Sequence, residues 1–428
     1  MENREEFELF GSRISILFYH LKLLNRPGLL SNLQRLVSTC GIFMLLSFNF
    51  ILIIAGVIDL RHVHDLPSLA TRISPLFFNI LGGFRWIFGM VNVKDIQKII
   101  DQMQYCHFLC LTLDESDLNY KRYRKKKSDF KKYMSIFSGV CLISFIGGTL
   151  KWCLNPVLYD IFYGFYTESK FNSTFLRHLP FAATYPWSID CTAKYFGTLG
   201  SQIVGGLTSA LGHSTFEILN VTLLAGSCIH LEYLTETLYQ ETENTSTVNE
   251  FHALKFEKKL KNCIIHHREV LIYLDKTIKM FTYPMFLMCL DTTMVICLEF
   301  LEASTMKIDS RVQYIMKLTS MFEYWSVTMA DLFVYCYFGT KIKELGLKVS
   351  DGLYCCDWLQ SITCRNISFE TSSKNAIQQM IKVSLVRAQK PIIVTGGLFP
   401  ILSIEVFRAL VGFAMSNALI LRRVAESL

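Results

Sequence analysis

The chain has 428 residues, of which 51% are hydrophobic and 18% are charged, and its mean hydropathy is +0.32. A soluble globular protein carries about a quarter charged residues, so this composition favours a membrane protein. The aromatic content and the nine Pro exclude a disordered chain, and fourteen Cys are too dilute for a disulfide scaffold. The first ten residues carry four Glu and no apolar core, so the sequence predicts no cleavable signal peptide.

Seven apolar stretches are long enough for a transmembrane helix, which needs about 20 residues. They lie at about 40–58, 73–91, 133–154, 195–224, 280–301, 315–338 and 391–421. Several contain isolated charges, among them Arg85, Glu217 and Asp331. Such charges are costly inside a bilayer, so we expect these helices to face one another or a wet cavity. The sequence therefore predicts an all-α membrane protein with seven transmembrane helices.

Lys and Arg are distributed unevenly between the connecting segments. The N-terminal segment and the loops after the second, fourth and sixth stretches are the richer ones, and a dense basic cluster spans 121–132. The positive-inside rule therefore predicts a cytoplasmic N-terminus and, after seven crossings, an extracellular C-terminus. A nucleic-acid site is the alternative interpretation of the basic cluster. A topology signal explains it better because it lies between two spans, so no nucleic-acid partner is expected.

The chain has four Asn-x-Ser/Thr sequons, at Asn172, Asn220, Asn244 and Asn366. In the predicted topology Asn220 lies inside a span, and Asn244 and Asn366 lie on the cytoplasmic side. Only Asn172, in the large outer loop at 159–195, is therefore predicted to carry a glycan. The aromatic and Pro-rich stretch at 179–187 of the same loop is predicted to cover the bundle as a lid.

Three C-terminal motifs resemble the insect odorant receptor family. Residues 332–342 read LFVYCYFGTKI, Tyr354 and Trp358 follow at the family's spacing, and 380–423 match its C-terminal signature, with RAQKP at 387–391 as the most specific part. Asp331, the Thr-Lys pair at 340–341 and the Met-Ser-Asn triplet at 415–417 depart from the family pattern. G-protein-coupled receptors have the opposite topology, and their Asp-Arg-Tyr and Asn-Pro-x-x-Tyr motifs are missing from the corresponding spans.

The resemblance implies an odorant receptor subunit of a heteromeric, ligand-gated, non-selective cation channel in the plasma membrane of olfactory sensory neuron dendrites. A short loop at about 235–276 indicates the ligand-tuning subunit, which forms a hetero-tetramer with the odorant co-receptor. The implied organisation is a cytoplasmic segment (1–37), six helices with an outer-half ligand pocket (38–338), a cytoplasmic anchor with the first part of helix seven (339–390), and the pore-lining helix with an extracellular tail (391–428). A gustatory receptor-like channel and a G-protein-coupled receptor are the alternatives, and a transporter is disfavoured because no internal repeat is apparent.

A volatile odorant has few polar atoms, so its site should be a small apolar cavity with aromatic walls and one or two polar groups. Gly148 and Trp152 are one helical turn apart, which leaves space beneath the indole. Packing in the core or against lipid is the alternative for each aromatic residue. The predicted ligand-binding residues are Phe77, Phe78, Phe145, Gly148, Trp152, Leu199, Gln202, Ile203, Met321, Phe322, Tyr324 and Trp325.

The last span carries a stripe of residues spaced by four, Gly412, Ser416, Ile420 and Val424, which lie close to one helix face. We predict that this stripe faces the pore, with Ile420 as a hydrophobic gate where the family has its gating aliphatic residue. Packing of Ile420 against a neighbouring helix is the alternative.

The sequence predicts neither an enzyme nor a cofactor. It contains no Gly-rich phosphate loop and no GxSxG motif. Cys263, His266 and His267 have helical spacing, but no carboxylate completes a ligand set, so no metal is expected. The sequence does not determine whether Cys153 and Cys191 form a disulfide.

Overall fold

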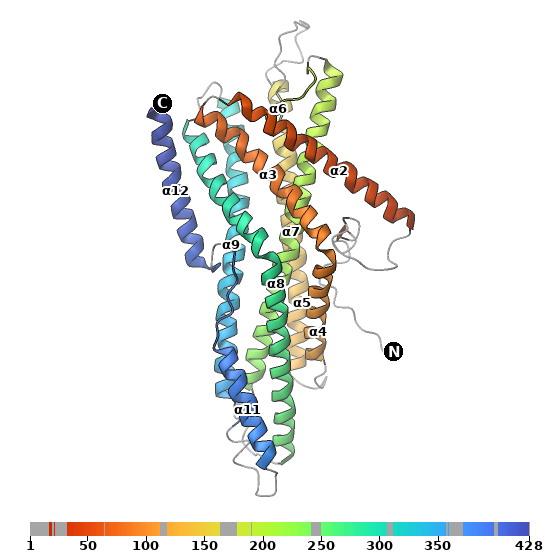
Figure 1. Cartoon of the computed structure of the whole chain (residues 1–428), viewed down its shortest axis with the longest axis vertical. Helices are drawn as coiled ribbons and strands as arrows, with labels where there is room; N and C mark the ends of the chain where they lie inside the picture. The colour runs from red at the N-terminus through yellow and green to blue at the C-terminus, as the bar shows by residue number, and fades with distance from the viewer. Residues whose placement is uncertain are drawn as a thin grey trace.

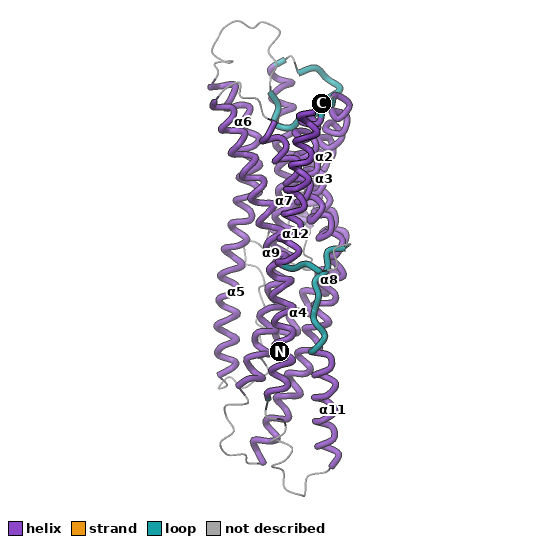
Figure 2. Tube along the Cα trace, turned by 90° about the vertical axis from the view of Figure 1, so that its left-hand side faces the viewer, coloured by secondary structure: helices purple, strands orange, loops and turns teal. Residues whose placement is uncertain are grey.

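The computed structural model describes residues 17–18, 21, 32–63, 65–111, 118–162, 178–189, 191–240, 250–305, 311–356, 358, 371–397 and 401–427. Within these ranges the chain is almost wholly helical and forms no β-sheet. Most helices run along the long axis of an elongated bundle, while α2 leans away from it at one end (Figures 1 and 2). The prediction of an all-α fold is confirmed.

The described elements, in chain order, are α2 (Asn32–Asp59), the 3₁₀ helix η1 (Leu60–His62), α3 (Leu66–Val91), α4 (Val93–Leu111), α5 (Leu118–Leu142), the π-helical turn η2 (Ile143–Gly147), α6 (Gly148–Phe162), α7 (Thr192–Gln240), α8 (Glu250–Thr305), α9 (Arg311–Cys355), α11 (Thr371–Ala388) and α12 (Ile404–Ser427). The helices α7, α8 and α9 have 49, 56 and 45 residues. At a rise of 1.5 Å per residue they are each about 70–85 Å long, which is more than twice the hydrocarbon thickness of a bilayer.

Six segments of the described chain are long and apolar enough to cross a membrane, namely Asn32–His62, Ser68–Val91, Tyr120–Leu158, Thr192–Tyr239, Glu257–Ser304 and Ile404–Arg423. The third of these is one continuous rod of α5, η2 and α6. The remaining predicted span, 315–338, lies within α9. This helix is long enough, but Lys317, Glu323 and Asp331 make it less apolar.

The seventh predicted span begins later than its apolar composition suggested. Residues 391–397 and 401–403 are not helical, and α12 begins at Ile404 instead of Pro391. Pro391 lacks a backbone N–H, and Gly397 adopts a φ of +63°, a conformation that interrupts a helix. Ser403 supplies the N-terminal cap of α12, because its hydroxyl accepts a hydrogen bond of 3.3 Å from the Val406 N–H.

The segment between α11 and α12 packs closely against α9. A Cβ atom at Gly339 would collide with the carbonyl oxygen of Leu402, so only glycine permits this approach. One residue further along α9, the Thr340 hydroxyl accepts a hydrogen bond of 3.1 Å from the Ile404 N–H. The glycine of the LFVYCYFGTKI motif therefore has a packing role, and α9 holds the first residue of α12.

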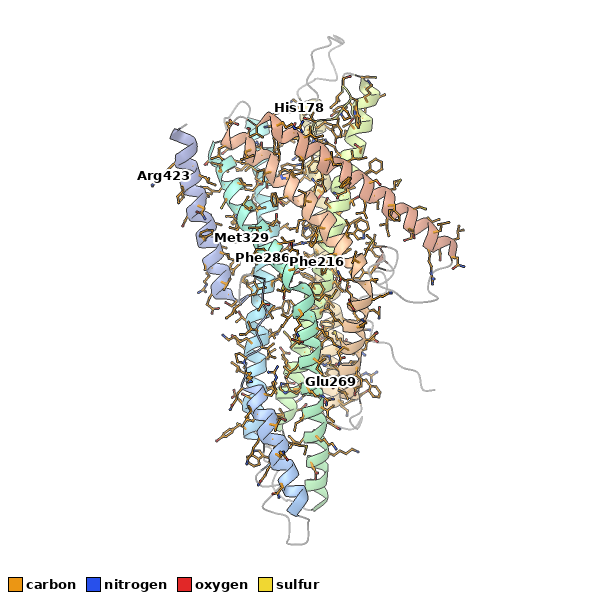
Figure 3. All side chains as sticks on the ribbon, viewed as in Figure 1. His178, Phe216, Glu269, Phe286, Met329 and Arg423 are labelled. Atoms are coloured by element: carbon orange, nitrogen blue, oxygen red, sulfur yellow. The ribbon has the colours of Figure 1, made fainter. Side chains whose placement is uncertain are left out.

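The core of the bundle is built around α7, which packs against α2, α3, α5, α8 and α9. Side chains fill the bundle along its length, and Figure 3 labels the buried Phe216 of α7 and the half-buried Phe286 of α8 near its middle. Cys153 is a fully buried free thiol and Cys191 is exposed, so the two are not joined in a disulfide.

Candidate ligand-binding site

A cavity of about 80 Å³ lies among α3, η2, α6, α8, α9 and the loop 178–189. Its wall combines aromatic rings, small residues and a few carboxyl and hydroxyl groups. The lining residues are Pro75, Phe78, Ser144, Phe145, Gly148, Thr149, Trp152, Phe181, Glu299, Ser320, Glu323, Tyr324 and Val327. Ser144 and Phe145 belong to the π-helical turn η2, a local irregularity that occurs frequently at functional sites.

The structure brings five of the twelve predicted ligand-binding residues to this cavity, namely Phe78, Phe145, Gly148, Trp152 and Tyr324. The other seven are elsewhere. Phe322 has 66% of its surface exposed, Trp325 packs on the cluster next to α12, and Leu199 and Met321 are buried. Phe77 is partly buried, and Gln202 and Ile203 contact the loop 178–189 instead. Four of the seven are on helices that line the cavity but on other faces, whereas Leu199, Gln202 and Ile203 belong to α7, which contributes no lining residue.

The loop 178–189 lies over one end of the cavity and is fixed there by side chains of the bundle. The Trp152 indole N–H donates a hydrogen bond of 2.9 Å to the Pro180 carbonyl oxygen. The Gln202 amide pairs with both backbone groups of Phe181, at 3.1 Å each. Burial raises the pKa of the Tyr185 hydroxyl, which therefore stays neutral and accepts a further hydrogen bond from Gln202. This arrangement places the Phe181 ring in the cavity wall.

Two polar atoms of the cavity wall lack a hydrogen-bond partner among the described residues. They are Glu299 Oε2 and the Tyr324 hydroxyl oxygen, and both are buried. The other carboxylate oxygen of Glu299 accepts a hydrogen bond of 2.7 Å from Ser74. A buried polar atom without a partner is costly, so these two atoms favour a ligand that supplies hydrogen bonds.

An ion pair stands at the more exposed side of the cavity. Lys151 Nζ lies 2.6 Å from a Glu323 carboxylate oxygen, with 41% and 36% of the two side chains exposed. Gly148 faces this pair closely, since an added Cβ would lie 3.2 Å from Glu323 Oε1. Glu299 and Glu323 lie within the predicted spans 280–301 and 315–338. Their place in one cavity could not be predicted because they come from different helices.

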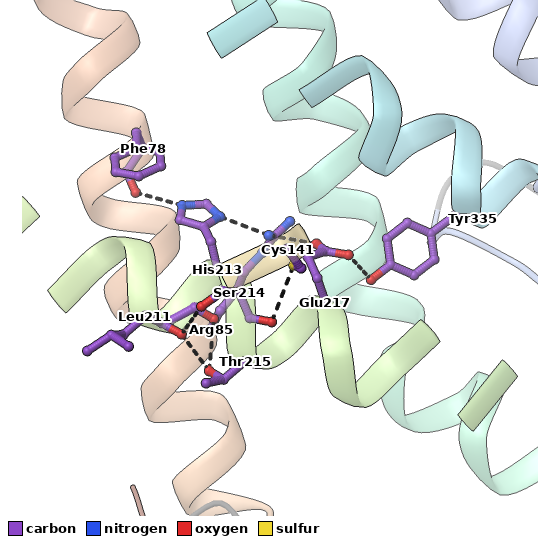
Figure 4. A network of polar contacts seen from close by, with 10 residues as sticks. Phe78, Arg85, Cys141, Leu211, His213, Ser214, Thr215, Glu217 and Tyr335 are labelled. Atoms are coloured by element: carbon purple, nitrogen blue, oxygen red, sulfur yellow. Dashed lines mark hydrogen bonds and ion pairs between the residues drawn. The ribbon is translucent and has the colours of Figure 1, made fainter. Parts of the chain in front are cut away.

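Two aromatic residues of the cavity wall, Phe78 and Phe145, pack against the buried His213. The His213 ring stacks between Phe78 and Phe145, with centroid distances of 4.6 and 5.5 Å. His213 Nε2 donates a hydrogen bond of 2.9 Å to the Phe78 carbonyl oxygen, so Nδ1 is the acceptor for Arg85, at 2.8 Å (Figure 4). Phe78 and Phe145 of the cavity wall therefore contact the buried polar residues in the interior of the bundle directly.

Arg85 continues this chain of contacts towards α9. The guanidinium lies 2.8 Å from Glu217 Oε1, and both side chains are only 2% exposed. The Tyr335 hydroxyl donates a short hydrogen bond to the other carboxylate oxygen of Glu217 (Figure 4). We call His213, Arg85, Glu217 and Tyr335 the buried polar network. It links α3, α7 and α9. The ion-pair partner of Glu217, Arg85, could not be predicted from the sequence.

A second cavity of about 10 Å³ lies beside this network. It shares Phe78, Phe145 and Tyr324 with the larger cavity, and Asp291 and Asp331 also line it. A volume of about this size accommodates one water molecule where polar partners are present. The three shared aromatic residues thus separate the larger, mainly apolar cavity from the small polar one.

The predicted pore stripe lies on the outer face of α12. Gly412, Ser416 and Ile420 are exposed, with Ile420 at 58%, while Ala414 and Ala418 are fully buried on the side that packs against α8. Leu419 is exposed at 49%. The side chain of Val424, like Asn172, lies outside the described residues.

Comparisons with known proteins agree on one family. Residues 65–415 match the sequence model of the 7tm Odorant receptor family. The chain is 20% identical to Odorant receptor 67c of Drosophila melanogaster over 88% of this chain and 86% of that protein. It is also 20% identical to Putative odorant receptor 92a of the same organism, over 89% and 86%. Its fold is similar to the olfactory receptor OR5 of Machilis hrabei in complex with eugenol, with a TM-score of 0.73, 15% identity and coverage of 96% and 98%. The structure of the same receptor without a named ligand gives a TM-score of 0.72.

Proposed function

This chain belongs to the insect odorant receptor family, and we propose from that membership that it is the ligand-tuning subunit of an odorant-gated, non-selective cation channel. The observation that carries the proposal is the cavity lined by Phe78, Phe145 and Trp152, because aromatic walls suit a small hydrophobic ligand. The channel activity is drawn from the resemblance of the C-terminal motifs to this family.

We propose a ligand with an apolar body and one hydrogen-bond donor, such as an alcohol, a phenol or an amine. The body would pack against the aromatic wall. The donor would satisfy Glu299 Oε2, while the Tyr324 hydroxyl would pair with the ligand's heteroatom. A hydrocarbon would leave both buried atoms without a partner, which costs about 1–3 kcal/mol for each polar group. The site would therefore prefer a hydroxylated or aminated ligand over its hydrocarbon analogue.

The proposed assembly is a hetero-tetramer with the odorant co-receptor, located in the plasma membrane of olfactory sensory neuron dendrites. The proposed topology has the N-terminus in the cytoplasm, seven crossings and the C-terminus outside. The C-terminal parts of α7 and α9 and the N-terminal part of α8 support a cytoplasmic anchor, because each of these three helices is longer than a bilayer is thick. α11 supports the same anchor. Figure 1 shows α11 at the end of the bundle opposite the C-terminus.

Co-expression with the family's co-receptor in a heterologous cell tests the proposal. We expect odorant-evoked inward current that G-protein inhibitors leave unchanged, and a stronger response to an alcohol than to the matching hydrocarbon. Current that these inhibitors abolish would favour a metabotropic receptor instead. A cell expressing the co-receptor alone is the control.

Glycosylation tests the proposed orientation. Asn172→Gln is expected to remove all N-glycan mass, because Asn172 is the one sequon that the topology places on the lumenal side during synthesis. Asn244→Gln and Asn366→Gln should leave the electrophoretic mass unchanged before and after glycosidase treatment. A glycan on Asn244 or Asn366 would reverse the orientation.

The exposed stripe of α12 yields a prediction about gating. A hydrophobic ring closes a pore by expelling water, so Ile420→Ser should raise the resting current in the absence of ligand or alter ion permeability. The measurement is whole-cell current at rest, with reversal potentials in solutions of different cations.

Leu419→Ser is the matched control for this prediction. Leu419 is also an exposed aliphatic side chain of α12, but it lies about 100° away around the helix. We expect its resting current to equal that of the unmodified receptor. Leakage through Leu419→Ser channels combined with closed Ile420→Ser channels would assign the pore to the other face.

A further inference from the structure

Three potential metal ligands from three helices converge in the part of the bundle distant from the odorant cavity. Cys110 is on α4, His230 on α7 and His266 on α8, and all three side chains are buried. Glu269, one helical turn beyond His266, marks this level of α8 in Figure 3. The sequence had grouped His266 with its neighbours Cys263 and His267, whereas the structure groups it with residues far away in the chain.

The spacing of the three ligand atoms fits a tetrahedral metal ion. Cys110 Sγ lies 3.8 Å from His230 Nδ1 and 3.7 Å from His266 Nε2, and the two nitrogens are 3.2 Å apart. Zinc bonds of about 2.3 Å to sulfur and 2.0–2.1 Å to nitrogen, at a tetrahedral angle, require about 3.6 Å between sulfur and nitrogen and about 3.3 Å between nitrogens. The protein's distances lie within about 0.2 Å of these values.

A buried set of hydrogen bonds lies next to Cys110. Lys127 Nζ is a donor only, so His107 Nε2 accepts from it at 2.8 Å, and His107 Nδ1 therefore carries the proton. This proton is donated to the Tyr123 hydroxyl oxygen at 2.6 Å, and the Cys110 thiol donates to the Cys106 carbonyl oxygen at 3.5 Å. Ordered partners of this kind orient and tune the ligands of metal sites.

We propose that Cys110, His230 and His266 bind one Zn²⁺ ion, which cross-links α4, α7 and α8. Thiolate and imidazole ligands suit this ion, and three protein ligands leave the fourth tetrahedral position to a water molecule. Binding releases the thiol proton of Cys110 to solvent, and the two neutral imidazoles lose no charge. The ion would stabilise the packing of three helices beyond the proposed membrane region. This inference is independent of the odorant-binding function.

Cobalt substitution of the full-length, detergent-solubilised receptor tests the site. After treatment with a chelator, we expect one equivalent of Co²⁺ to produce a sulfur-to-cobalt charge-transfer band and the intense visible bands of a tetrahedral site. Zn²⁺ should displace Co²⁺ and abolish both features. Receptor without any Co²⁺-dependent charge-transfer band would overturn the proposal and indicate a hydrogen-bonded cluster without metal.

Substitutions of Cys110, His230 and His266 test whether each of these residues binds the metal ion. Cys110→Ser should abolish the charge-transfer band, and His230→Gln and His266→Gln should each weaken Co²⁺ binding by about tenfold or more. Cys228→Ser and His267→Gln are the controls, because they replace buried residues of the same types on α7 and α8 outside the cluster. A band that survives Cys110→Ser would exclude this cysteine as a ligand. The spectrum of the unmodified receptor remains decisive if a histidine variant fails to fold.

Discussion

Trp152→Ala is expected to raise the odorant concentration needed for a half-maximal response by about tenfold to a hundredfold. The substitution removes a large aromatic wall of the cavity, and a buried aromatic contributes about 1–3 kcal/mol to binding. It also removes the indole donor that holds the Pro180 carbonyl, so the loop 178–189 loses one of its attachments. Concentration–response curves of the channel formed with the co-receptor measure the effect.

Gly148→Leu should weaken the response by the opposite route, because its side chain would fill the cavity next to Glu323. Phe322→Ala is the matched control, since this aromatic residue is exposed on α9 and does not line the cavity. All three variants should reach the surface and pass current with an agonist of the co-receptor. Unchanged odorant sensitivity in both Trp152→Ala and Gly148→Leu would locate the binding site elsewhere.

Arg85→Met is expected to destabilise the receptor by about 3–5 kcal/mol. It removes the cation that neutralises Glu217 and leaves a carboxylate buried without its ion-pair partner, which is far more costly than losing the pair as a whole. The expected result is a strongly lowered thermal midpoint and a low yield of folded protein in size-exclusion chromatography. The midpoint of the detergent-solubilised receptor is the measurement.

Neutralising the remaining charge should recover much of this loss. Arg85→Met combined with Glu217→Gln keeps an acceptor for the Tyr335 hydroxyl and removes the unpaired carboxylate. Lys98→Met serves as the control because the Lys98–Asp95 pair is largely exposed, and exposed pairs contribute little. Equal thermal midpoints for Arg85→Met and Lys98→Met would show that the buried network does not stabilise the fold.

The helices and their approximate positions were predictable because spanning length and apolar composition are local properties of the sequence. The start of α12 was not predicted correctly, although its signals are local too. Pro391, Gly397 and Ser403 mark an interruption and a cap, but a run of apolar residues on both sides outweighed them. Hydropathy averages over a window and therefore cannot separate an extended apolar segment from a helical one.

The cavity was only partly predictable for a different physical reason. Several helices are apolar around most of their circumference, so composition does not reveal which face points inward. Tyr324 lines the cavity whereas Phe322, two residues away, faces outward. Contacts between segments far apart in the chain could not be predicted from the sequence either. Arg85 and Glu217 are 132 residues apart in the chain, and the three proposed zinc ligands come from separate helices.

A single helix joins the ligand cavity to the first residue of the proposed pore helix. Ser320, Glu323 and Tyr324 of α9 line the cavity, and Thr340 of the same helix holds the backbone of Ile404. Sixteen residues separate Tyr324 from Thr340, a distance of about 24 Å along a helix. α9 is unbroken between these points. We therefore expect that a tilt or rotation of its cavity-lining part would also move the N-terminal end of α12.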